Sequence, residues 1–142
     1  MASWVSTEQG RHLRRRKKTD TEPELLLRKA LHAAGARFRL HRRLAPGCTP
    51  DIVLPGRRIA VFVDGDYWHS CPAHGRTAPF CGPNAALWEE KMRRNKERDV
   101  RSTQIAEDLG WTVVRVWECS IRTRAAQVAD SVLNGQHIAP AP

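Results

Sequence analysis

The segment from Asp64 to Gly75 holds the densest group of side chains that can bind metals or transfer protons. Within twelve residues it has two aspartates, two histidines and a cysteine, together with an adjacent tyrosine and tryptophan. Cys71 and His74 are separated by two residues, a spacing that allows both to bind one zinc ion. The other candidate zinc ligands are Asp66 or Cys81 and, far along the chain, Cys119. A buried free cysteine is the ordinary alternative for each thiol.

Asp51, Glu24 and His69 are candidates for the reaction itself. Asp51 is the first residue of a predicted strand, beside the irregular segment that begins at Asp64, and its carboxylate can bind a hard cation there. An aspartate at the start of a strand is also common without such a role. Glu24 either closes a helix-capping box or points toward the same metal, and the two roles are compatible. His69 follows two aspartates, which favours general acid–base catalysis over a purely structural role.

Aromatic and basic side chains accompany these candidates. Tyr67, Trp68 and Trp88 either cap the hydrophobic core, which the pattern alone favours, or stack on nucleic-acid bases. The helix that starts near Trp88 places four polar side chains on one face: Lys91, Asn95, Arg98 and Asp99. This face is either an ordinary charged surface or a surface that holds phosphate oxygens near a metal.

The chain as a whole is strongly basic. Its 142 residues include 24 Lys and Arg against 15 Asp and Glu, a net charge of +9. Such an excess favours a polyanionic partner, most commonly nucleic acid. Close to the N-terminus lies a dense basic run made of Arg11, Arg14, Arg15, Arg16, Lys17 and Lys18. We expect this run to form an arm that contacts DNA, with a solvated tail as the alternative.

The length and a hydrophobic fraction of 41% suit one globular domain. We expect a basic arm at 1–19, a single domain at 20–135 and a disordered tail at 136–142. No apolar run approaches the length of about 20 residues that spans a bilayer, and the N-terminus has no apolar signal region. We therefore expect a cytoplasmic protein that does not associate with membranes, in which disulfide bonds are not expected.

The pattern of apolar and turn residues predicts an α/β fold. Helices are predicted at 22–34, 86–109 and 121–133. Strands are predicted at 37–40, half-buried, and at 51–54, 59–63 and 112–117. The continuous apolar run at 59–63 predicts a central strand buried on both faces, and 112–117 is expected to be buried as well. Between them, residues 64–86 are rich in Gly and Pro, which predicts a long irregular loop. The order α-β-β-β-α-β-α indicates one mixed sheet flanked by helices.

Taken in order, these blocks resemble the very-short-patch mismatch repair (Vsr-type) DNA endonucleases. The resemblance covers about residues 11–122 and includes Pro50-Asp51-Ile52-Val53, the run from Val61 to Gly65, and Tyr67-Trp68-His69. Further matching blocks are Asp20-Thr21 with Glu24, Cys71-Pro72, His74-Gly75, Trp88, Lys91, Asn95, Arg98-Asp99, Gly110-Trp111 and Trp117-Glu118-Cys119. The resemblance implies a restriction-endonuclease-like fold with a zinc-stapled loop. It also implies a Mg²⁺-dependent nick 5′ of the thymine in a T:G mismatch, the product of 5-methylcytosine deamination.

The same resemblance implies roles for individual residues. Asp51, with the main-chain carbonyl of Val63, would bind Mg²⁺, while His69 would be the active-site histidine and Glu24 an N-terminal acidic residue of the site. The DNA-contacting residues would be Tyr67, Trp68 and Trp88 as a wedge, with Lys91, Asn95, Arg98, Arg14, Arg15 and Arg16. The structural zinc ligands would be Cys71, His74 and Cys119.

Two positions depart from the family's pattern. Asp66 stands where many members have a zinc-binding cysteine; an aspartate oxygen can still bind zinc, and Cys81 is the alternative fourth ligand. Asp64 stands where some members have a second active-site histidine, and we keep it as a catalytic candidate.

The expected partner is double-stranded DNA with a T:G mismatch, bound by a monomer, with mismatch-repair proteins as candidate further partners. Two alternatives remain open. One is a zinc-stabilised DNA-binding module without catalysis, and the other is a nickase of the same fold with a different lesion preference. The bases that flank the cleavage site do not follow from the sequence, because the side chains that read base edges cannot be assigned.

Overall fold

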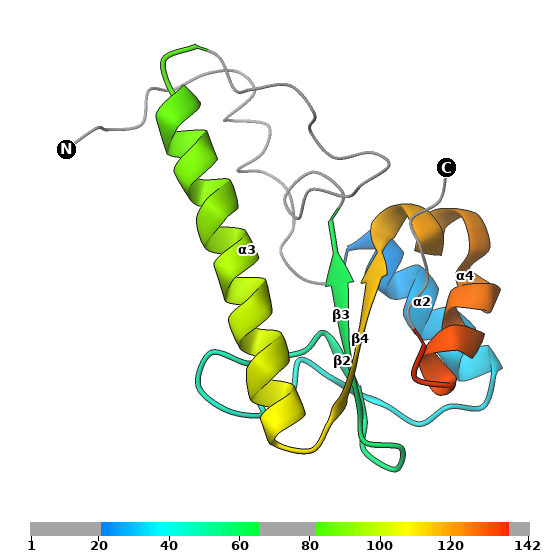
Figure 1. Ribbon diagram of the computed structural model, residues 1–142. Coiled ribbons are helices and arrows are strands. Elements are labelled where there is room, and N and C mark those ends of the chain that lie inside the picture. The colour runs from blue at the N-terminus through cyan, green and yellow to red at the C-terminus, as the bar shows by residue number, and fades with distance from the viewer. Residues whose placement is uncertain (1–20, 66–81, 137–142) are drawn as a thin grey trace.

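A computed structural model describes residues 21–65 and 82–136 of the chain (Figure 1). The elements are α2 (Glu22–Ala33), β1 (Arg39–Leu40), β2 (Ile52–Leu54), β3 (Ile59–Asp64), α3 (Ala85–Asp108), β4 (Thr112–Trp117) and α4 (Glu118–Leu133). The four strands form one sheet in the order β1-β2-β3-β4. The first three strands are antiparallel, and β3 and β4 are parallel. The predicted α/β fold with a mixed sheet is confirmed, and it is compatible with a restriction-endonuclease-like architecture.

Helices cover both faces of the sheet. α2 and α4 pack together on one face, while α3 crosses the other (Figure 1). Because strand side chains alternate between faces, neighbouring strand residues belong to different cores. Val61 and Val114 join the aliphatic core with α2 and α4, whereas Ala60 and Phe62 join a smaller core against Ala106 of α3. β3 is therefore buried on both faces, as its continuous apolar run predicts.

Local signals explain where the helices begin and end. The Thr21 hydroxyl caps α2 by accepting a hydrogen bond from the backbone N–H of Glu24 at 3.5 Å. Asn84 stands at the N-cap position of α3 but makes no side-chain capping hydrogen bond, and the C-terminal turn is followed by Gly110, whose φ of 88° suits glycine. Within the described ranges, no helix combines the length and the apolar character needed to cross a membrane.

Several predicted boundaries were wrong. β1 has only two residues, both exposed, because it is the edge strand; only Phe38 of the predicted half-buried stretch packs on the core. β2 begins at Ile52, one residue late, and β3 extends to Asp64. α4 begins at Glu118, three residues early, because the chain enters it directly from β4 without a side-chain cap that the sequence could reveal. Most of the predicted loop, residues 66–81, lies outside the described residues.

Candidate active site

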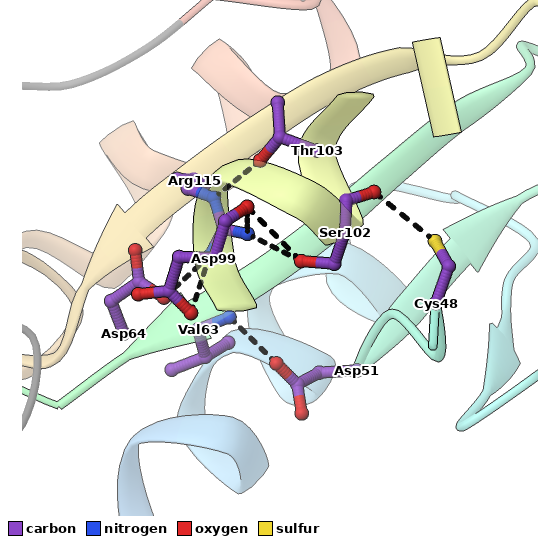
Figure 2. A network of polar contacts seen from close by, with 8 residues as sticks. All are labelled: Cys48, Asp51, Val63, Asp64, Asp99, Ser102, Thr103 and Arg115. Atoms are coloured by element: carbon purple, nitrogen blue, oxygen red, sulfur yellow. Dashed lines mark hydrogen bonds and ion pairs between the residues drawn. The ribbon is translucent and has the colours of Figure 1, made fainter. Parts of the chain in front are cut away.

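Asp51 lies just before β2, next to the end of the central strand β3. Its Oδ2 accepts a hydrogen bond from the backbone N–H of Val63 at 2.7 Å (Figure 2). Within the described chain, no hydrogen-bond donor contacts the other oxygen, Oδ1. Burial raises the pKa of Asp51, and the nearby charge of Asp64 raises it further. The Val63 N–H and the charges of His41 and Arg115 oppose this effect only in part.

The chemistry of Asp51 fits a divalent cation. A carboxylate whose ionised form is disfavoured by burial gains stabilisation from a positive charge placed against it. Mg²⁺ in proteins typically has one or two carboxylate ligands and keeps several waters, so one carboxylate and a main-chain carbonyl are a sufficient protein contribution. Among residues 21–65 and 82–136, no three His, Cys, Asp or Glu side chains form a closed metal cage.

Asp64 is held by a half-buried arginine, Arg115, which the sequence analysis did not single out. Nη1 of Arg115, on β4, donates to Oδ1 of Asp64 at 2.9 Å, and only 5% of Asp64 is exposed. The guanidinium also lies over the Phe62 ring, 4.3 Å from its centroid. It makes three hydrogen bonds to α3: to Thr103 Oγ1 at 2.9 Å, the Asp99 carbonyl at 2.8 Å and Ser102 Oγ at 3.0 Å (Figure 2). Arg115 thus joins β3, β4 and α3 beside Asp51.

A signal for Arg115 was present in the sequence. It interrupts the apolar run from Thr112 to Trp117, a strand predicted to be buried. A charged side chain in such a strand requires a partner, because a buried unpaired charge is costly. The structure identifies this partner as Asp64 on the neighbouring strand β3.

Glu24 is connected to Asp51 through His41. The Glu24 carboxylate is 3.3 Å from Nη2 of Arg28 and 3.8 Å from Nε2 of His41. The backbone N–H of His41 donates to the backbone carbonyl of Asp51 at 3.1 Å. His41 has a φ of 47°, a left-handed conformation that costs a non-glycine residue roughly 1–2 kcal/mol. The structure therefore shows the Thr21 half of the capping box and also brings Glu24 to the side of the sheet where Asp51 lies.

The predicted DNA-binding residues of α3 lie on a helix in which two of the six basic residues, Arg93 and Arg94, pair with glutamates of the same helix. Lys91 and Arg98 are exposed, Asn95 and Trp88 are half-buried, and Nζ of Lys91 lies 5.8 Å from the centroid of the Trp88 ring. Glu90 accepts hydrogen bonds from Arg93 and Arg94, which lower its pKa to about 2. Arg93 also pairs with Glu97.

Cys119 is the one predicted zinc ligand among the described residues. It is buried in the first turn of α4, where Trp117 packs against it. The other predicted metal-binding, catalytic and wedge residues lie outside the described residues: Asp66, Tyr67, Trp68, His69, Cys71, His74 and Cys81. The same holds for the arm residues Arg14, Arg15 and Arg16. The zinc site therefore stays a prediction.

A carboxylate at a strand end of a mixed sheet, next to a second acid in a strongly basic chain, is typical of a nuclease. The family model described as DNA mismatch endonuclease Vsr matches residues 4–74, half of the chain. The chain therefore belongs to the Vsr family. It is a strand-specific DNA endonuclease, a hydrolase of phosphodiester bonds, and DNA is its partner.

Curated relatives match over most of the chain. The type II nicking enzyme V.NaeI of Lentzea aerocolonigenes is 39% identical over 138 residues, which cover 94% of this chain and 81% of that enzyme. The type II nicking enzyme V.XorIIP of Xanthomonas oryzae pv. oryzae is 39% identical over 123 residues, 85% of this chain and 88% of that enzyme. The DNA mismatch endonuclease Vsr of Escherichia coli is 35% identical over 105 residues, 74% of this chain and 65% of that protein.

Proposed function

We propose that this endonuclease nicks one strand of duplex DNA 5′ of the thymine in a T:G mismatch, in repair of deaminated 5-methylcytosine. The observation that carries the proposal is the Asp51 carboxylate. It is fixed by Val63 at 2.7 Å, and burial raises its pKa. Membership of a family with a relative named DNA mismatch endonuclease supports the mismatch as substrate.

In this proposal Asp51 and the main-chain carbonyl of Val63 hold Mg²⁺ in a restriction-endonuclease-like core. When bound, the ion would neutralise charge on the scissile phosphate and on the leaving 3′-oxygen. The hydrogen bond from Val63 keeps the Asp51 carboxylate in one orientation. His69 would orient or deprotonate the attacking water.

Asp64 has a different proposed role from the histidine found there in some family members. Its carboxylate is held by Arg115 at 2.9 Å, an arrangement that suits a fixed structural role better than that of a proton carrier. We propose instead that it adds negative charge beside Asp51 and keeps α3 in place through Arg115. Glu24 would contribute indirectly: its carboxylate lies 3.8 Å from Nε2 of His41, and the backbone N–H of His41 donates to the carbonyl of Asp51.

The remaining roles follow the family resemblance. We propose that Tyr67, Trp68 and Trp88 form the wedge at the mismatch, since unstacking is least costly at a mispaired base. Lys91, Asn95 and Arg98, together with the arm residues Arg14, Arg15 and Arg16, would contact the DNA backbone. A structural zinc ion would be held by Cys71, His74, Cys119 and either Asp66 or Cys81. The enzyme would act as a monomer.

The test of catalysis is a nicking assay with duplexes that carry each mismatch in randomised flanks, with and without Mg²⁺. We expect a nick at T:G only with the metal. Asp51→Asn should lower the rate at least about 100-fold, because losing the anionic ligand removes several kcal/mol of metal assistance. DNA binding by this variant should remain.

Each competing result identifies a specific alternative. Binding by the wild type with no nicking of any duplex would indicate a DNA-binding module. Efficient nicking of other lesions or of paired sequences would favour a nickase with a different preference. This is the second candidate function because two relatives are named nicking enzymes. Near-normal nicking by Asp51→Asn would refute the site.

The zinc site has its own test. Elemental analysis of chelator-washed protein should find about one zinc ion per chain, and Cys119→Ser should lower both the zinc content and the melting temperature. Zinc-free protein with an unchanged melting temperature would refute a structural zinc.

A further inference from the structure

The segment between Glu24 and Asp51 is basic throughout. Residues 25–50 include six Lys and Arg and no Asp or Glu. Four of these arginines lie in and beside the edge strand β1, and all four are exposed: Arg37, Arg39, Arg42 and Arg43. We call these four residues the arginine edge.

The arginine edge stands out among the described residues by the density of its unpartnered arginines: Arg98 and Arg101 of α3 also lack a hydrogen bond or ion pair, but they lie on a helix with six acids. Within the described chain, none of its four guanidinium groups makes a hydrogen bond or ion pair. By contrast, Arg57 and Arg58 donate to the backbone carbonyls of Leu133 and Leu109 at 3.3 and 2.9 Å. Four unpaired cations in seven residues repel one another, so this surface favours an anionic partner.

The arginine edge leads directly to Asp51. β1 pairs with β2 so that Arg39 faces Val53 and Leu40 faces Ile52. The next pairing is the hydrogen bond from the His41 N–H to the Asp51 carbonyl. At His41 the left-handed φ of 47° turns the chain, so Arg42 and Arg43 follow immediately after the residue that contacts Asp51.

We propose that the arginine edge binds the phosphate backbone of duplex DNA beside the scissile bond. Guanidinium groups bind phosphate oxygens in a bidentate geometry. The chain from Arg39 to Arg43 spans at most about 14 Å. This is roughly the rise of four base pairs at about 3.4 Å each, so neighbouring phosphates are within reach. The position beside the scissile bond rests on the proposed function of Asp51, whereas the contact with DNA does not.

The test is fluorescence anisotropy of a labelled, fully paired 20-bp duplex, measured without divalent cations over a range of NaCl concentrations. The full-length variant Arg42→Gln/Arg43→Gln is compared with Arg57→Gln, an exposed arginine in the turn at the other end of β2. Each lost phosphate contact makes the slope of log K against log salt shallower by about 0.9. We therefore expect a change of roughly 1.8 in the double variant and none in Arg57→Gln.

An unchanged slope in the double variant, with a wild-type melting curve, would overturn the proposal. The arginines would then serve only to prevent edge-to-edge pairing of β1. The same anisotropy measurement is repeated with a double-stranded RNA of equal length. If the double variant lost binding to this RNA but bound the DNA duplex as the wild type does, the proposal would also be overturned. Because this assay involves neither a mismatch nor a nick, its result is independent of the proposed reaction.

A second measurement tests the position. Single phosphates around the T:G site are replaced by uncharged methylphosphonates, and binding is compared for wild type and Arg42→Gln. Near the nick, a neutral phosphate should weaken wild-type binding and have no further effect on the variant. If that pattern appears only at phosphates remote from the nick, the edge binds DNA but not beside Asp51.

Discussion

Helix α3 and the arginine edge are both rich in basic side chains, but they differ in how those charges are used. α3 has six Lys and Arg and also six Asp and Glu, so its formal charge is zero. Arg93 and Arg94 pair with glutamates on the same helix. The arginine edge belongs to a segment with no acid at all. The excess charge of the described chain near Asp51 therefore lies at the sheet edge rather than on the long helix.

This difference teaches that the number of basic residues in a segment does not identify the surface that binds a polyanion. An arginine paired within its own helix already has an anionic partner, and DNA must compete with that partner. An unpaired arginine releases counterions from DNA without such competition. The following predictions test this contrast, from the largest expected effect to the smallest.

Arg115→Met should have the largest effect, because Arg115 keeps α3 in position relative to Asp64. Loss of one partner of a largely buried ion pair and of three further hydrogen bonds should lower the free energy of unfolding by about 2–4 kcal/mol. Urea denaturation measures this change. The control is Arg101→Met, an exposed arginine of α3, for which we expect less than about 0.5 kcal/mol.

The double variant Asp64→Asn/Arg115→Met tests whether the two residues form a unit. It should lose less stability than the sum of the single variants, since no unpaired charge is left behind. Additive losses, or a loss below about 1 kcal/mol for Arg115→Met alone, would show that α3 is held by its apolar contacts.

Removing two of the six acids of α3 should make this helix more like the arginine edge. Glu90→Gln/Glu97→Gln would free Arg93 and Arg94 and give the helix a formal charge of +2. If α3 faces the duplex, DNA binding should tighten, and the salt slope should steepen by about 0.9 for each arginine that gains a phosphate. Glu22→Gln, an exposed acid of α2, is the control for the change in net charge. Equal effects of both substitutions would show that overall charge matters and that the position of α3 does not.

Titration of Glu90 gives the smallest effect. Its pKa in the folded chain is lowered to about 2 by Arg93 and Arg94. A lowered folded pKa means that the stabilising pair is fully present above the unfolded pKa of about 4.3 and is lost as the pH falls toward about 2. Because Glu90 is exposed, the effect on stability should be small. NMR titration of its side chain should give a midpoint near 2, and Arg93→Gln/Arg94→Gln should return it toward the usual value.

Much of the architecture could be predicted from sequence, because strong local signals coincide with the fold. The continuous run from Ile59 to Val63 indicated a strand buried on both faces, and the Thr21 cap indicated the start of α2. The exposure of β1 could not be predicted, because alternation looks the same on an edge strand and on a half-buried one. The early start of α4 had no capping residue to mark it.

The site could be predicted only in part. Asp51 stood out as a carboxylate at a strand end, and the structure supports that position through its bond to Val63. Arg115 and His41 were missed, because their importance comes from partners that are distant along the chain. The arginine edge was missed because residue counts do not separate paired from unpaired charges. The predictions for His69 and Trp68 stay untested, since both lie outside the described residues.

The parallel pairing of β3 with β4 has a consequence for the order in which the site forms during folding. The Asp51–Val63 contact closes a loop of only 12 residues, whereas Asp64 and Arg115 are 51 residues apart. The longer closure costs about 1.3 kcal/mol more in chain entropy. We therefore expect β2 and β3 to bring Asp51 to Val63 early, and Arg115 to reach Asp64 only after β4 docks. In stopped-flow experiments, Arg115→Met should mainly accelerate unfolding; slower refolding would show that the long closure belongs to the folding nucleus.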